Sequence, residues 1–293
     1  MSKQSLNELL KWSIINQATE KEDASAEGAT AKPLEKLDPS IIDAILGKSE
    51  AQQMVDAMTV IKSPNATEEQ KEIAWEDFEM LVEQIDNASN VENMKLWAPI
   101  LEELKNENPK FREQAAWVCG TTTNNNPKAQ AAENGLTPVI ELLSDPVPFV
   151  RAKAIYALNG AIKHYDPALA EFKNKDGYKI LVNLLKTEAD LTLLRKVVFL
   201  INNLLIQDPE CNVELARQEI VHVLSSLLEK HMEDEDLVEK TLVTLKTFFE
   251  VASSPVPPSA HALIRPKILE AKKKYGDHML DSSSWAELEK YTA

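Results

Sequence analysis

The feature of this sequence that most constrains its fold is a helical pattern that recurs about every 40 residues. Each copy opens with a basic residue and continues through small and apolar positions, and the copies begin at Lys71, Arg112, Arg151 and Arg195. A unit of this size cannot bury its apolar face alone, so successive units must stack on one another. The pattern therefore predicts a solenoid in which equivalent residues of neighbouring repeats lie side by side.

A shorter helix is expected between successive copies of the long one. Its apolar residues at i, i+3 and i+7 define one buried face, and copies occur at 97–104, 136–143, 178–185 and 220–227. Pro99 and Pro138 occupy matching places near its start, where the first helical N–H groups need no internal partner. This three-part period is typical of armadillo repeats. We therefore expect an all-α, right-handed armadillo-repeat solenoid with flanking helices at both ends.

Two glycines mark junctions between the short helices. Gly135 follows Asn134, and Gly177 follows Asp176. Glycine adopts the left-handed backbone conformation that ends a helix sharply at little steric cost. We expect each glycine to supply that conformation at its junction.

The repeats divide the chain into four expected segments. These are a flexible N-terminal segment at 1–31, helices leading into the array at 32–70, armadillo-type repeats at 71–252, and a helical C-terminal cap at 253–293. Within the first segment, Leu6–Ile15 is apolar but too short to bury much surface by itself. It either docks on the solenoid or serves as a recognition segment for another molecule.

Composition disfavours several classes of function. The formal net charge of −15 opposes general binding to nucleic acid or to an anionic membrane. No apolar stretch reaches the roughly 20 residues that span a bilayer, and we find no secretory signal. Cys119 and Cys211 lie far apart without metal-site spacing, as expected in a reducing compartment. We expect a cytoplasmic protein, with the nucleus as a second location.

No motif in the sequence indicates catalysis, a cofactor or a metal. The chain has no phosphate-binding glycine loop, no metalloprotease helix and no nucleophile elbow, and its five histidines lack ligand spacing. The acidic run at 233–236 is expected to be an exposed turn. The sequence therefore favours a binding protein over an enzyme.

The row of basic residues that opens the repeated helices has two interpretations. In armadillo-type solenoids this third helix lines the concave face, so Lys71, Arg112, Arg151 and Arg195 could form a ladder towards an acidic partner. Alternatively, each basic residue pairs with a glutamate of its own repeat. Spacing alone does not separate the two.

Three stretches carry a resemblance to a known family. They are Leu9–Ile15, with the Trp12-Ser-Ile motif, Phe78–Asn90, which ends in Asp-Asn-Ala-Ser-Asn, and Val91–Trp97. In this order they resemble the armadillo-type nucleotide-exchange factors of cytosolic 70-kDa heat-shock (DnaK-type) chaperones, the Hsp-binding-protein family. The sequence departs from the usual armadillo pattern at Gly160, where many repeats carry an asparagine, and matches loosely after Ser253.

The resemblance implies a co-chaperone that embraces one lobe of the chaperone's nucleotide-binding domain and opens its ADP cleft. Such a factor binds no nucleotide or other cofactor itself, and we expect a monomer. On this basis the chaperone-binding residues are expected to be Glu79, Asn87, Ala88, Asn90, Arg112, Arg151, Asn159, Arg195 and Asn203. The resemblance further implies that the N-terminal segment mimics substrate polypeptide through Leu6, Leu9, Leu10, Trp12, Ile14 and Ile15.

Two readings compete with this one. A peptide-binding armadillo adaptor would need regular Trp and Asn ladders along the third helices, for which Trp117, Asn159 and the pair at 202–203 are the only candidates. An enzyme within a helical scaffold would need polar groups that converge in one pocket.

Overall fold

The computed structural model describes residues 47–131, 135–252 and 258–293, and within these ranges every regular element is a helix. The α-helices are α3 (Glu50–Lys62), α4 (Glu68–Val82), α5 (Ile85–Asn90), α6 (Trp97–Glu103), α7 (Pro109–Thr123), α8 (Pro127–Gln130), α9 (Leu136–Glu141), α10 (Pro148–Ile162), α11 (Asp166–Asn174), α12 (Gly177–Thr187), α13 (Leu191–Gln207), α14 (Cys211–Arg217), α15 (Ile220–His231), α16 (Glu235–Val251), α17 (Pro258–Tyr275) and α18 (Ser282–Tyr291). Two 3-10 turns, η1 (Leu142–Ser144) and η2 (Gly276–His278), complete the set.

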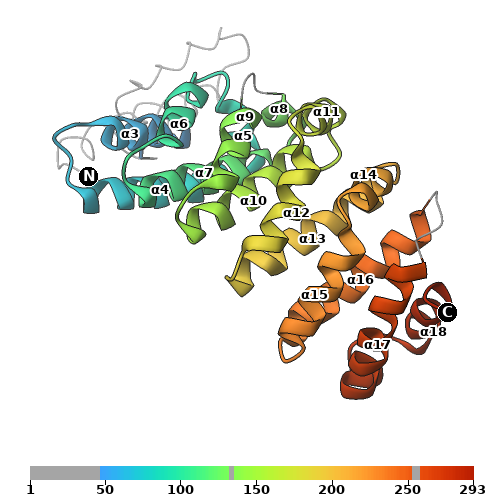
Figure 1. Cartoon of the computed structure of the whole chain (residues 1–293). Coiled ribbons are helices and arrows are strands. Elements are labelled where there is room, and N and C mark those ends of the chain that lie inside the picture. The colour runs from blue at the N-terminus through green and yellow to red at the C-terminus, as the bar shows by residue number, and fades with distance from the viewer. Residues whose placement is uncertain (1–46, 132–134, 253–257) are drawn as a thin grey trace, which may run out of the picture.

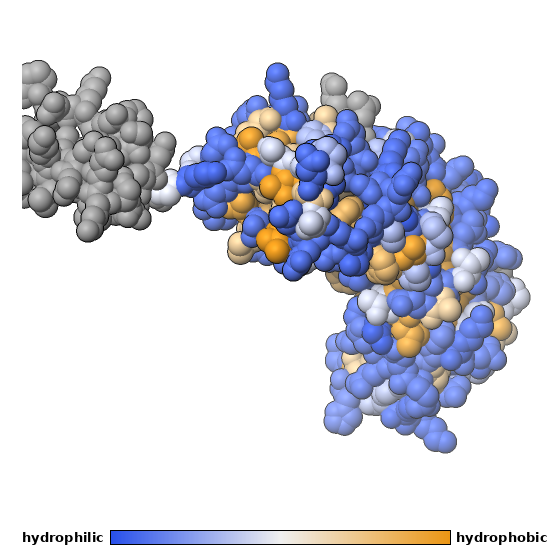
Figure 2. Space-filling model, turned by 90° about the vertical axis from the view of Figure 1, so that its left-hand side faces the viewer, coloured by the Kyte–Doolittle hydropathy of each residue, from blue (hydrophilic) through white to orange (hydrophobic). Residues whose placement is uncertain are grey.

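The helices follow one another in groups of three. Each group has two shorter helices and then a long third helix, so that α5–α7, α8–α10, α11–α13 and α14–α16 are successive repeats, and α3–α4 precede them. The long helices α4, α7, α10, α13 and α16 pack in chain order, each against the next (Figure 1). The predicted all-α solenoid is confirmed, and its stack of helices bends along its length (Figure 2).

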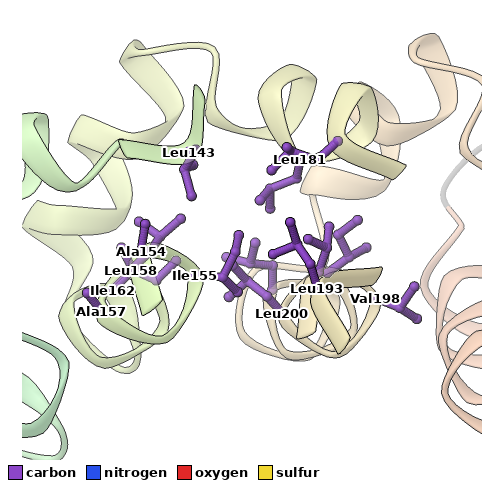
Figure 3. Packing of buried hydrophobic residues seen from close by; sticks show 14 of the residues in the cluster. Leu143, Ala154, Ile155, Ala157, Leu158, Ile162, Leu181, Leu193, Val198 and Leu200 are labelled. Carbon is purple, nitrogen blue, oxygen red and sulfur yellow. The ribbon is translucent and has the colours of Figure 1, made fainter. Parts of the chain in front are cut away.

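The hydrophobic core lies between the long helices and the second helices of the repeats. Figure 3 shows Leu143 and Leu181 reaching down towards the layer that contains α10 and α13. Leu158 of α10 and Leu193 of α13 are fully buried in that layer. Because each fully buried leucine contributes about 1.5–3 kcal/mol of transfer free energy, stacking of repeats supplies most of the stability. One continuous core cluster runs from α3 to α18.

Polar caps fix where the long helices begin. Thr67 accepts a hydrogen bond from the Gln70 backbone, and the Gln70 side chain accepts one from the Thr67 backbone, so the two residues form a capping box before Glu68. Asp190 and Asp234 cap α13 and α16 in the simpler way, by accepting from backbone N–H groups. These caps hold the starts of α4, α13 and α16 in place, whereas α10 begins after Val147 without a side-chain cap.

The turn before the second helix differs from the expectation. Asp176 and its equivalent Glu219, not a glycine, adopt the left-handed conformation, with φ values of 56° and 59°. Gly135 has an ordinary φ of −73°. Gly177 is required for a different reason, because a Cβ atom there would collide with the Phe172 ring. The glycine prediction was therefore wrong about backbone conformation, and close packing explains Gly177.

A second close approach joins α7 to α10. A Cβ atom on Gly160 would lie 2.8 Å from both the Gly120 carbonyl oxygen and the Thr123 hydroxyl. A side chain at this position would therefore push the two long helices apart. The departure from the usual asparagine at Gly160 allows this pair of helices to pack unusually closely.

The two ends of the described chain are built differently. The C-terminal end is covered by α17 and α18, and Trp285 of α18 is fully buried. At the N-terminal end, Lys71 lies one turn inside α4, so the expected boundary at residue 71 falls within a helix. The expected flexible segment at 1–31 and the first part of 32–70 lie outside the described residues. No helix in the described ranges is long and apolar enough to cross a membrane.

Candidate functional site

The exposed sides of the long helices form one continuous surface, which we call the third-helix face. Residues on it recur every three or four positions, as expected for one side of a helix. We define it by Trp117 and Thr121 of α7, Lys153, Tyr156 and Asn159 of α10, and Lys196, Phe199, Asn203 and Ile206 of α13.

Hydrogen bonds tie the beginning of this face together. The Thr121 hydroxyl donates to Glu79 Oε1 of α4 at 2.7 Å and lies 3.3 Å from the Tyr156 hydroxyl of α10. Glu79 is only 7% exposed. The candidate residue Glu79 therefore lies beside the third-helix face and positions Thr121 on it.

A cation–π contact continues the face from α7 to α10. Lys153 Nζ lies 3.4 Å from the centroid of the Trp117 ring. Burial lowers the pKa of Lys153, and the positive charge of Lys196 acts in the same direction while Glu113 opposes it. Because Lys153 covers the Trp117 ring, this tryptophan is not free to clamp a peptide, which weighs against the peptide-binding adaptor.

The face becomes apolar towards α13. Asn203 donates a hydrogen bond of 3.3 Å to Asn159 Oδ1, which brings together two of the candidate residues. Beside them, Phe199 and Ile206 are 48% and 64% exposed. Large apolar side chains that a fold leaves in solvent beside satisfied polar groups are typical of a protein-binding surface.

The arginines of the basic row bind carboxylates across repeat boundaries. Arg112 pairs bidentately with Asp145 at 2.7 and 3.1 Å, and Arg151 pairs with Glu188, with its Nε at 3.0 Å from Oε2. Each acceptor lies in the turn before the next long helix. Arg112 and Arg151 therefore pair within the chain, which differs from a ladder that faces an acidic partner. Their carboxylates belong to the following repeat, which differs from pairing within the same repeat. Neither interpretation of the row was right in full.

Arg195 repeats this arrangement but is more accessible. Its Nε lies 3.1 Å from Asp234 Oδ1, and a second contact reaches Asp236 at 3.5 Å. Its side chain is 32% exposed, against 14% for Arg112 and for Arg151. Asp234 is mostly buried, so the acidic run is not wholly the solvated turn that we expected. Of the three arginines, Arg195 has the most surface available to a partner.

Lys71, the first member of the basic row, behaves differently from the arginines. Its Nζ lies 5.8 Å from the centroid of the Phe111 ring at the start of α7. The row is therefore not one uniform ladder of charges.

The stretch at 86–90 contains Asn87, Ala88 and Asn90, three of the expected chaperone-binding residues, and it is less accessible than that expectation requires. It forms the short helix α5. Ala88 is only 3% exposed, so the interpretation of this residue as a surface position was wrong. Asn87 is nearly as buried and donates hydrogen bonds to Glu50 and to the Leu81 carbonyl. Asn90 alone among the three candidates here is exposed.

Sequence reasoning missed several residues that complete these arrangements. The partner carboxylates Asp145, Glu188 and Asp234 each stand shortly before a long helix, and this recurrence was visible in the sequence. Phe199 and Ile206 had no such signal, because an exposed apolar residue cannot be told from a buried one without the packing. The candidate substrate-mimicking residues between Leu6 and Ile15 lie outside the described residues. In the described ranges no group of histidine, cysteine and carboxylate side chains could hold a metal ion.

The arrangement of the described helices defines an armadillo-type α-solenoid. A designed armadillo repeat protein superposes with a TM-score of 0.65 at 12% identity, covering 82% of this chain and 100% of that one. A second designed armadillo repeat protein, solved in complex with the peptide (KR)4, gives a TM-score of 0.60 at 14% identity, covering 84% of this chain and 98% of that one. These similarities show the fold.

Sequence comparison identifies the family. The model described as "Nucleotide exchange factor Fes1" matches residues 6–91, and "SIL1/FES1/HPBP1 C-terminal domain" matches 87–219. A protein of Yarrowia lipolytica named "Hsp70 nucleotide exchange factor FES1" is 35% identical over 79% of both chains. A protein of the same name from Gibberella zeae is 40% identical over 59% of this chain and 85% of its own length. Another from Mycosarcoma maydis is 40% identical over 69% of this chain and 55% of its own length. This chain belongs to the Fes1 family of nucleotide exchange factors.

Proposed function

We propose that this chain is a co-chaperone that binds the nucleotide-binding domain of a 70-kDa heat-shock chaperone and accelerates the release of ADP. The observation that carries the proposal is the 35% identity, over 79% of both chains, to a relative named as an exchange factor for Hsp70. The chain contributes binding energy and performs no chemical step of its own. We propose further that it acts as a monomer in the cytosol.

The physical basis of this activity is linkage between two binding equilibria. A protein that binds the open, nucleotide-free chaperone more tightly than the ADP-bound form must weaken ADP binding by the same factor. A coupling of 1.4 kcal/mol corresponds to about tenfold weaker ADP binding. The rigid solenoid suits this role because it loses little conformational freedom when it binds, and its binding energy can then hold the cleft open.

The third-helix face is our candidate for the contact surface. Phe199 and Ile206 offer apolar area that is already held in place by α13, and the Asn159–Asn203 pair lies beside them. Arg195, at the start of the same helix, adds a partly exposed charge. An apolar centre bordered by polar groups is the usual anatomy of a protein interface.

The test is stopped-flow release of a labelled ADP from a purified cytosolic 70-kDa chaperone. We expect the parent protein to accelerate release, and Phe199→Asp to reduce that acceleration at least about tenfold by placing a charge in an apolar contact. The matched control is Val213→Asp on α14, because Val213 is exposed to 39% but lies off the third-helix face. Unchanged release at saturating parent protein would reject the function. Equal losses in both variants would reject the face.

The role of the N-terminal segment is a separate proposal. If residues Leu6–Ile15 mimic substrate polypeptide, a chain that lacks residues 1–31 should accelerate ADP release normally but slow the departure of bound peptide from the chaperone. Peptide departure that is unaffected by the deletion would remove this role while leaving nucleotide exchange intact.

A further inference from the structure

Helix α4, the first long helix of the array, has two opposite sides with different surroundings. One side faces the next repeat: Glu72 accepts a hydrogen bond from Lys110 at 2.7 Å, and Glu79 accepts one from Thr121 at 2.7 Å. Glu68 lies on this side too and accepts from Asn108, which caps α7. Helical spacing then turns the side with Gln70 and Asp77 away from α7.

The side of α4 that faces away from α7 forms an apolar groove with α3. The groove has a volume of about 750 Å³ and is lined by Ala57 and Val60 of α3 and by Ile73, Ala74, Met80 and Leu81 of α4, among others. Ile73 and Met80 are 53% and 61% exposed. Figure 2 views the molecule from this end and shows hydrophobic side chains among the hydrophilic ones on it.

In every later long helix, the side that faces away from the next repeat is covered by the preceding long helix. Helix α4 packs on α7, α7 on α10, α10 on α13 and α13 on α16, and the far end of the array is covered by α17 and α18. Within the described ranges, α3 and α4 have no equivalent cover. Solenoid ends require a capping element because an internal repeat surface is too apolar to face water.

The chain itself contains an apolar segment with suitable properties. In Leu6–Ile15, residues at 6, 9, 10 and 14 fall on one side of a helix, so the segment can present a continuous apolar stripe. Residues 16–49 connect it to α3, and this number of residues is enough for the segment to reach the groove beside α3. The segment carries one acidic and one basic residue, Glu8 and Lys11, so it has no net charge that would oppose docking beside Asp56 and Asp77, which line the groove.

The family comparison links the same two regions. One family model spans residues 6–91 without a break and so contains both the apolar segment and the groove helices α3 and α4. We propose that Leu6–Ile15 docks as an amphipathic helix in the groove between α3 and α4, where it forms the N-terminal cap of the solenoid in the free protein.

Docking of the segment also affects the proposed co-chaperone role. This effect rests on the proposed function, whereas the docking itself does not. A docked segment buries the apolar residues that would otherwise enter the chaperone's peptide site. The groove and the chaperone's peptide site then compete for the same segment. The equilibrium between docked and released segment sets the fraction of molecules whose segment can enter the peptide site.

Hydrogen–deuterium exchange of the full chain, followed by mass spectrometry, tests the docking without any partner. We expect the amides of residues 6–15 to exchange at least about tenfold more slowly than in the variant Ile73→Asp/Met80→Asp, which places charges in the groove. Both side chains are more than half exposed, so this variant keeps its fold, as circular dichroism should verify. The control is Leu269→Asp, since Leu269 is an apolar residue of α17 that is 43% exposed at the opposite end.

Three results would overturn the proposal. Amides 6–15 that exchange at the intrinsic rate in the parent would show that the segment does not dock. Equal protection in the parent and in the groove variant would place the segment elsewhere. Protection that disappears on dilution, together with a larger mass in sedimentation, would show that a second copy of the chain supplies the cover. As a reciprocal check, Leu10→Asp should expose the groove and increase binding of an apolar dye.

Discussion

The pairing of Arg151 with Glu188 gives the sharpest test of whether the arginine row is structural. Their side chains are only 14% and 6% exposed, and Arg151 also donates to the Asp145 carbonyl at 2.7 Å. Arg151→Met leaves the Glu188 carboxylate buried without its cation, a change that typically costs 3–5 kcal/mol. Glu188 retains two backbone donors, from Ala189 and Asp190, so we expect the lower end, about 3 kcal/mol.

Removing both charges should restore most of that loss. In the double variant Arg151→Met/Glu188→Gln no buried charge remains, and the glutamine oxygen can still accept from the backbone, so we expect a cost of about 1 kcal/mol. Urea denaturation followed by circular dichroism measures all four members of this double-mutant cycle. Titration calorimetry with the chaperone's nucleotide-binding domain then measures binding by the folded double variant.

The outcomes separate the two interpretations of the row. If the pair serves the fold, the double variant binds like the parent although the single variant is unstable. A folded double variant that fails to bind would show that Arg151 contacts the partner. An Arg151→Met protein as stable as the parent would refute the structural argument itself.

Three further predictions concern stability, pH and reactivity. Because Ala88 is buried, Ala88→Arg should destabilise the fold by about 3 kcal/mol or more in urea denaturation, whereas Asn90→Arg should not. Hydrogen bonds from Arg195 hold the pKa of Asp234 below its usual range, so this pair should stabilise the fold above about pH 4 and lose its contribution as pH falls through the lowered pKa. The stability difference between the parent and Asp234→Asn should therefore shrink on acidification to about pH 3. Burial raises the pKa of Cys119 and Cys211 to about 12, so a thiol reagent at about pH 8 should label both only after unfolding.

The pattern of the sequence determined the fold class, because the repeat is a local property. Two features can be recognised from helical periodicity alone, without knowledge of distant residues. They are the apolar faces of the second helices and the basic residues that begin the third helices, Arg112, Arg151 and Arg195. The cap before Glu68 was predictable for the same reason, since Thr67 and Gln70 are three positions apart. The family resemblance rested on contiguous motifs and is confirmed by the comparisons.

Only the tertiary structure decided what the candidate residues touch. Arg112 and its carboxylate partner Asp145 are 33 positions apart, and a row of arginines looks the same in sequence whether it faces a partner or the next repeat. Ala88 was misplaced because a small residue suits both a buried corner and an open surface. Exposure and pairing depend on how neighbouring repeats stack, and that geometry is a sum of many weak contacts that no single stretch of sequence encodes.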